Sequence, residues 1–190
     1  MMKHFFLFLG LTFSGLSGFA QEFKWDVNAG YLHVTSRLSV DYSDINIYTP
    51  DDPFLIGEFT STETANGYYL GLGGQYRLEG AMAISGSLNY ARYAESNFLQ
   101  VPLALHFYIA NSGFNVLAGP QLTYNLEDLG PFKDDINKLN IGAGAGLGYD
   151  FTERLFLEAR YTFQLNKYFK SDNTPEIRTN YLNIGLGYRF

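Results

Sequence analysis

Leu182-Asn183-Ile184-Gly185-Leu186-Gly187-Tyr188-Arg189-Phe190 closes the chain with a strict alternation of large apolar side chains and small or polar ones. Successive side chains of a β-strand point to opposite faces, so this stretch predicts a strand with one apolar face. The same period of two recurs upstream in windows that span residues 25–31, 68–78, 82–90, 99–109, 114–125, 140–151 and 155–166. The alternation therefore predicts an all-β fold of eight strands.

The links between these windows alternate in length. Tight turns are expected at residues 79–80, 111–113 and 152–153, and longer loops at 37–66, 127–138 and 169–179, with one short link at 94–97. Tight turns at one end and long loops at the other are typical of outer-membrane barrels, in which the turns lie in the periplasm and the loops outside the cell. We therefore predict an eight-stranded antiparallel up-and-down transmembrane β-barrel.

A soluble lipocalin-like barrel or a sandwich is the alternative, and it would turn the apolar face inward. The aromatic residues favour the membrane, because amphipathic rings prefer the bilayer interface. They gather near both ends of the predicted strands: Trp25, Tyr76, Phe107, Tyr149, Phe156, Tyr188 and Phe190 at the turn end, and Tyr31, Tyr68, Tyr90, Tyr124 and Tyr168 at the loop end.

The composition excludes several classes of protein. Only 17% of the 190 residues are charged, with 19 acidic against 13 basic, which argues against a nucleic-acid partner. The absence of cysteine removes disulfides, thiolate zinc sites and catalytic thiols.

The first twenty residues have the layout of a cleaved secretory signal. Lys3 precedes an apolar stretch at residues 5–13, and small residues stand at Gly18 and Ala20. We expect a signal peptide at 1–20, export, and a barrel domain at 21–190 in the outer membrane.

Several motifs resemble those of the PorT-like family of small outer-membrane β-barrels. They are Val101-Pro102-Leu103, Ala118-Gly119-Pro120, the glycine strand at 142–149, Ala159-Arg160-Tyr161 and the closing 185–190. The resemblance spans nearly the whole expected mature chain and implies fold and location rather than activity. It also implies that Tyr188 and Phe190 form the C-terminal signal recognised by the barrel assembly machinery.

Eight strands enclose an interior that side chains can fill. Because an unpaired buried charge is costly, we expect the inward charges to form a closed polar network. Its expected members are Asp26, Arg77, His106, Glu158, Arg160 and Arg189. Glu158 could pair with Arg160, Arg189 or Arg77, and the inward glycines would make room for these side chains.

Catalysis has little support in the sequence, and no cofactor or metal is expected. The glycine run at 142–148 lacks the spacing of a nucleotide-binding loop. His106 is expected to be a lumen residue. His33 could join Ser36, Asp41 or Asp44 in a lipid-modifying site outside the cell, which keeps an enzyme open as an alternative.

The loop expected at 37–66 is acidic, so it could bind calcium or divalent ions that bridge lipopolysaccharide. Its acidic residues are Asp41, Asp44, Asp51, Asp52, Glu58 and Glu63. Its apolar residues suggest a hairpin that extends the barrel or covers its mouth.

The leading function is a filled barrel with a structural or interaction role and no catalytic activity. Its expected partners are outer-membrane lipid, the barrel assembly machinery during insertion, and an unknown partner at 37–66. A narrow pore or a transport or secretion accessory is the main alternative.

Overall fold

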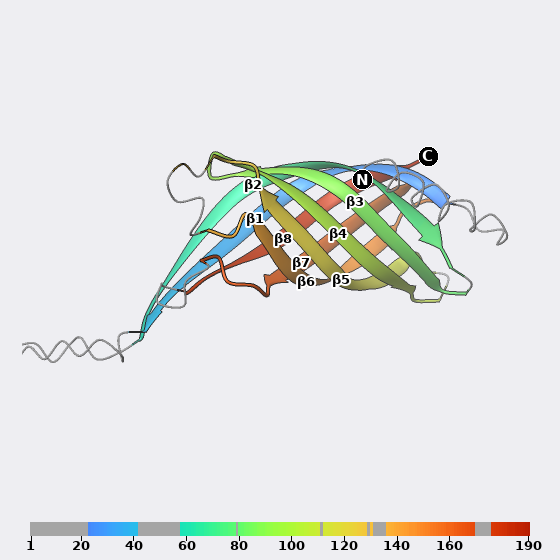
Figure 1. The fold of residues 1–190 in the computed structure, drawn as a ribbon. Helices are drawn as coiled ribbons and strands as arrows, with labels where there is room; N and C mark the ends of the chain where they lie inside the picture. Colours follow the sequence, from blue (N-terminus) through green and yellow to red (C-terminus); the bar gives the residue numbers. More distant parts are fainter. Residues whose placement is uncertain are drawn as a thin grey trace, which may run out of the picture.

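A closed barrel of eight strands forms the fold in the computed structural model (Figure 1). The structure describes residues 23–41, 58–78, 80–110, 112–128, 130, 136–169 and 176–190. The strands are β1 (Phe23–Asp41), β2 (Glu58–Arg77), β3 (Met82–Tyr93), β4 (Ser96–Tyr108), β5 (Phe114–Asn125), β6 (Leu139–Asp150), β7 (Leu155–Gln164) and β8 (Glu176–Arg189). Each strand pairs antiparallel with its neighbours in the chain, and β1 pairs with β8 to close the sheet. This confirms the predicted fold class. The described part of the chain contains no helix long and apolar enough to cross a membrane.

Most large apolar side chains of the strands point outward. Leu70 and Leu72 of β2 are 60% and 67% exposed, and Leu147 of β6 is 61% exposed. The alternate positions of β2, Gly71 and Gly73, are buried. This is the reverse of a soluble carrier, which would hold its apolar face inside. The outer face is a continuous apolar surface of the kind that a bilayer covers.

The first two strands are much longer than the windows 25–31 and 68–78 that alternation predicted. β1 and β2 remain paired as far as Asp41 and Glu58, and in Figure 1 they run together beyond the ends of the other strands. The added segments are rich in Val and Thr, whose branched side chains favour extended backbone. The loop expected at 37–66 therefore begins and ends as a hairpin that extends the barrel, and its remaining residues 42–57 lie outside the described residues.

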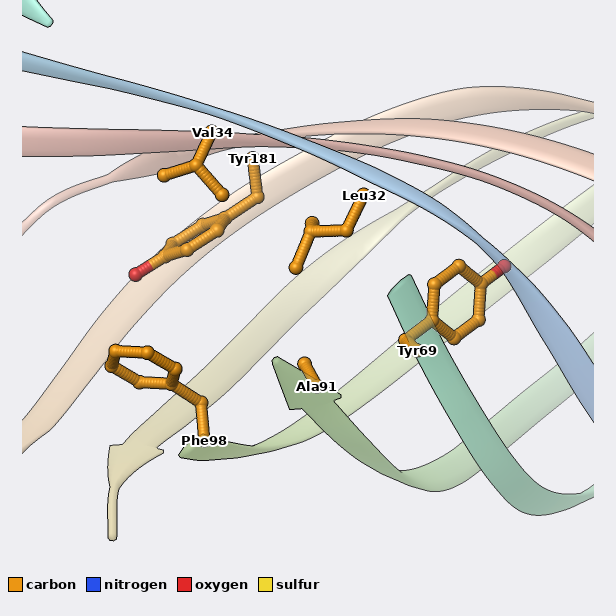
Figure 2. Packing of buried hydrophobic residues seen from close by; sticks show 6 residues of the cluster. All are labelled: Leu32, Val34, Tyr69, Ala91, Phe98 and Tyr181. Atoms are coloured by element: carbon orange, nitrogen blue, oxygen red, sulfur yellow. The ribbon is translucent and has the colours of Figure 1, made fainter. Parts of the chain in front are cut away.

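An apolar cluster fills the loop end of the lumen (Figure 2). Leu32 and Val34 of β1 are fully or almost fully buried there, and the whole cluster consists of Leu32, Val34, Tyr69, Ala91, Phe98 and Tyr181. Tyr93 packs against it and stacks on Phe98 with the ring centroids 4.4 Å apart. We call the six buried residues, without Tyr93, the apolar lumen cluster. It was not predicted, because the inward residues were expected to be polar throughout.

Candidate functional site

The lumen below the apolar lumen cluster is polar. Alternation along each strand turns these side chains inward, since residues two apart share a face. The buried polar residues include Asp26, Gln75, Asn89, Gln100, His106, Asn115, Gln121, Arg160, Asn183 and Arg189. This region holds most of the predicted network and is the candidate site of the molecule.

A two-pronged ion pair crosses the turn end of the lumen. The Nη1 and Nη2 atoms of Arg189 lie 2.9 and 3.0 Å from Oδ2 and Oδ1 of Asp150, and both side chains are largely buried. Tyr108 donates its hydroxyl to Oδ2 of Asp150 at 3.2 Å. The guanidinium of Arg189 also lies 4.2 Å from the centroid of the Phe156 ring. Asp150 was missed by the sequence analysis, although it occupies the last inward position of the glycine strand.

Glu158 pairs with Arg160 on its own strand. The distance from Oε1 of Glu158 to Nη2 of Arg160 is 2.7 Å, and both side chains are mostly shielded from solvent. Of the three partners that the sequence left open, the structure brings Arg160 to Glu158, whereas Arg189 binds Asp150 instead.

Arg77 lies at the turn end of the lumen, over the ring of Tyr108. It is exposed at the turn end of β2, with its guanidinium 4.3 Å from the centroid of the Tyr108 ring. Arg77 contacts the network through Tyr108, whose hydroxyl donates to Asp150, and its membership of the network stays a prediction. Its position as the last residue of β2 explains why its side chain is exposed.

Asp26 and His106 have neutral hydrogen-bond partners. Asp26 is 7% exposed, and its Oδ1 accepts a hydrogen bond from Nδ2 of Asn28 at 3.1 Å. His106 is 3% exposed, with Nδ1 2.9 Å from Oδ1 of Asn115 and Nε2 2.7 Å from Oγ of Ser85. Both ring nitrogens are thus engaged, and His106 serves as a linker between β3, β4 and β5.

Inward glycines make room for large side chains on neighbouring strands. A Cβ atom on Gly185 would meet the Tyr69 hydroxyl, and one on Gly187 would meet the Phe156 ring. Phe156 is only 9% exposed, so its expected place in the outer aromatic belt was wrong. Phe156 occupies an inward position on β7, between the outward Leu155 and Leu157.

Eight of the other aromatic residues expected in the two belts are exposed on the outer face, four near each end of the strands. They include Trp25, Phe107, Tyr188 and Phe190 at the turn end and Tyr31, Tyr68, Tyr90 and Tyr124 at the loop end. The rings of Tyr188 and Phe190 meet edge to face with their centroids 5.4 Å apart. Their role as an assembly signal stays a prediction.

The alternative lipid-modifying site is not assembled by the described residues. His33 Nδ1 lies 2.8 Å from Oδ1 of Asn66 on the outer face of the β1–β2 hairpin. Ser36 lies on the opposite face, with its Oγ 3.3 Å from Oγ1 of Thr179. Asp44 and the expected signal peptide at 1–20 lie outside the described residues. Within the described ranges, no three His, Cys, Asp or Glu side chains come together as a metal site.

The match to a protein family agrees with this architecture. The family described as "Outer membrane protein beta-barrel domain" matches residues 6–190. No curated protein sequence matches the chain. Neisserial surface protein A, NspA, aligns at 15% identity and a TM-score of 0.47, covering 87% of this chain and 97% of its own. Ail of Yersinia pestis aligns at 15% identity and a TM-score of 0.47 over 89% of this chain and 99% of its own. OprG of Pseudomonas aeruginosa aligns at 12% identity and a TM-score of 0.44 over 90% and 97%.

The family match spans nearly the whole chain, including all eight strands of the closed barrel. The apolar outer face and its two aromatic belts fit the same assignment. This chain belongs to the outer membrane protein beta-barrel domain family and is a small integral protein of the outer membrane.

Proposed function

We propose that the protein is a filled, non-catalytic barrel that presents a β-sheet outside the cell to bind an extended segment of another protein. The observation that carries the proposal is the unpaired edge of β2 beyond the barrel wall. The PorT-like resemblance, which also stays a prediction, is consistent with this role and does not specify it.

The outer face of the β1–β2 hairpin changes from apolar to polar at one position along both strands. On the outer face of β1, Tyr31 is followed by His33, Thr35 and Arg37, so the lipid-facing side becomes polar after Tyr31. The outer face of β2 changes at the paired position, since Tyr31 is opposite Tyr68. The polar parts of both strands therefore stand outside the membrane.

This protruding sheet contains three strands. β8 accompanies β1 as far as the pair Ser39 and Glu176, while β2 accompanies it to Asp41. On its other side, β2 pairs with β3 only from the pair Gly67 and Tyr93 onward. Among the described residues, nothing pairs with the second edge of residues 58–66.

An unpaired edge presents a row of backbone N–H and C=O groups that an extended chain can satisfy. The edge carries Thr60, Thr62 and Thr64 on one face, whereas Phe59 on the other face is 54% exposed. A threonine-rich strand with one exposed aromatic ring suits the addition of a strand with an alternating polar and apolar pattern. The proposed occupant is such a segment of a partner protein.

Two matched deletions separate the sheet from its tip. The first replaces residues 37–62 with Asn-Gly, which joins the paired positions Ser36 and Glu63 through a two-residue turn and removes most of the edge. The second replaces residues 42–57 with Asn-Gly between Asp41 and Glu58 and keeps the edge. Position 64 is present in both variants and carries a photoreactive benzophenone residue.

Irradiation of intact cells is expected to give a protein adduct in the full chain and in the tip deletion, and none in the sheet deletion. All three proteins should reach the outer membrane and shift in a gel on boiling, which controls for folding. An adduct that disappears when only the tip is removed would assign binding to residues 42–57 and contradict the edge. An adduct of twice the chain mass would identify a second copy rather than a different protein.

A further inference from the structure

The turn between β6 and β7 is held in one conformation by its own hydrogen bonds. Oγ1 of Thr152 accepts from the backbone N–H groups of Arg154 and Leu155, at 3.2 and 2.9 Å. The backbone N–H groups of Phe151 and Thr152 donate to the carbonyl of Leu155, at 2.9 and 3.3 Å. The N–H of Arg189 donates to the carbonyl of Arg154 at 2.7 Å, which ties the turn to β8. The side chains of this turn therefore start from fixed backbone positions.

The two charged side chains of the turn go to different partners. Oε2 of Glu153 lies 3.7 Å from Nζ of Lys24, which occupies an inward position of β1. Nη1 of Arg154 instead donates at 3.2 Å to the phenol oxygen of Tyr188, on the outer face of β8. Within the described ranges, no carboxylate forms an ion pair with the Arg154 guanidinium. A positive charge thus reaches the outer face of the barrel without an anionic partner there.

Arg154 and Tyr188 have hydrogen-bond donors to spare. Tyr188 accepts the bond from Arg154, so its own O–H can donate to a third group. A guanidinium carries five N–H donors in a planar fork, and neither side chain has a further hydrogen-bond partner in the part of the chain that the structure describes. This set of donors suits a phosphate, whose oxygens accept from arginine in pairs.

The pair lies at the level of the turn-end aromatic belt. The Tyr188 ring meets Phe190 edge to face, and the N–H of Phe190 donates to the carbonyl of Trp25, whose side chain is 63% exposed. The next outward position of β8, Leu186, is apolar and 52% exposed. Aromatic belts mark the boundary between hydrocarbon and headgroups. The Arg154 guanidinium therefore lies at headgroup depth, beside an apolar wall that acyl chains can cover.

Depth and charge together identify the occupant. The short turns of an outer-membrane barrel lie on the periplasmic side, where the leaflet consists of glycerophospholipids. We propose that Arg154 and Tyr188 bind the phosphate of an anionic glycerophospholipid in this leaflet. A headgroup without an amine, such as that of phosphatidylglycerol, gains most from one arginine because nothing within the lipid neutralises its phosphate. The site lies at the opposite end of the barrel from the β2 edge and is independent of the proposed function.

The fluorescence of Trp25 tests the site directly, since Trp25 is the only tryptophan of the 190 residues. The folded protein is placed in phosphatidylcholine vesicles with increasing fractions of phosphatidylglycerol that carries bromine near the carboxyl end of its acyl chains, and quenching is measured. A reference series contains brominated phosphatidylcholine instead. Phosphatidylglycerol is expected to quench more at equal mole fraction, with an affinity for this position about fivefold higher.

Three variants locate the preference. Arg154→Gln keeps a donor for the Tyr188 oxygen and removes the charge, so the two lipids should quench Trp25 equally. Tyr188→Phe keeps the ring and removes the phenol group, so the preference should become smaller. Arg77→Gln is the matched control, because Arg77 stands at the same end of the barrel with its guanidinium over the Tyr108 ring, and it should keep the full preference. Each variant should still shift in a gel on boiling.

A preference for phosphatidylglycerol that survives Arg154→Gln would overturn the proposal. Its loss in Arg77→Gln as well would assign it to the summed charge of the turn end rather than to this site, and an unchanged preference in Tyr188→Phe would contradict the role of the phenol. Inorganic phosphate added to the vesicles separates the two sources of the same chemistry. Suppression of the preference by millimolar phosphate would identify a site for the free ion and contradict a lipid site, whereas a retained preference supports the lipid.

Discussion

At the scale of single residues, alternation could predict which side chains enter the lumen but not how they pair. Asp26, Glu158, Arg160 and Arg189 all face inward as expected from their positions along the strands. The ion pair between Arg189 and Asp150 joins β8 to β6, two strands that are not neighbours in the sheet. Such a contact depends on the stagger of the strands around the barrel, which no local pattern contains.

The Arg189–Asp150 pair gives the first residue-scale prediction. Arg189→Gln should lower the free energy of unfolding by about 3–5 kcal/mol, because it leaves the buried Asp150 carboxylate without its charge partner. Adding Asp150→Asn should restore most of the loss. Urea unfolding in lipid vesicles measures both variants.

The exposed pair of Arg178 and Glu176 is the matched control, with side chains 60% and 39% exposed. Arg178→Gln should cost less than about 1 kcal/mol. A loss for Arg189→Gln as small as this control would show that the lumen pair contributes little.

At the scale of the elements, β1 shows why the apolar lumen cluster escaped prediction. Inside the membrane its odd positions are apolar and face lipid, whereas Leu32 and Val34 are apolar at even positions and face the lumen. The inversion occurs where the outer face of β1 changes from apolar to polar residues, after Tyr31. A pattern search that assumes one apolar face per strand ends the strand at this inversion, although the β-structure continues to Asp41.

The same boundary predicts a contrast between two outward positions of β2. Leu72→Arg should destabilise the barrel by about 2–4 kcal/mol if the residue lies near the bilayer midplane, since a charge there faces hydrocarbon. Thr64→Arg, on the same face of the same strand but beyond Tyr68, should change stability by less than about 1 kcal/mol. Both are measured by urea unfolding in vesicles. Equal losses of stability in the two variants would show that position 64 also faces hydrocarbon, which would contradict a sheet outside the membrane.

At the scale of the whole molecule, the strand count, the topology and the apolar exterior could all be predicted, because each follows from period-two alternation and link lengths. The lumen was expected to be closed by polar pairs alone. The structure instead places two chemically different layers across it, the apolar lumen cluster and the Arg189–Asp150 pair.

Two layers predict that the barrel does not conduct ions. In planar bilayers the full chain should give no current steps, and Phe98→Ala combined with Tyr181→Ala should also give none, because the Arg189–Asp150 layer remains. The matched variant Phe107→Ala combined with Tyr124→Ala truncates the same residue types on the lipid face. Steps in the full chain would support the narrow-pore alternative. Steps in the lumen variant alone would show that the apolar layer is the only effective seal.

The closing of the sheet by β1 and β8 makes the wall a ring. The backbone N–H of Phe190 donates to the carbonyl of Trp25 at 2.8 Å, so the last residue lies beside the beginning of the first strand. A circular permutant could therefore join Phe190 to Phe23 and open the chain at the tight turn of Gly113, with every strand pair retained. In that molecule Tyr188 and Phe190 would keep their places in the wall and lose their place at the end of the chain. Whether this permutant is inserted into the outer membrane would distinguish a signal that must stand at the end of the chain from contacts that the folded barrel needs.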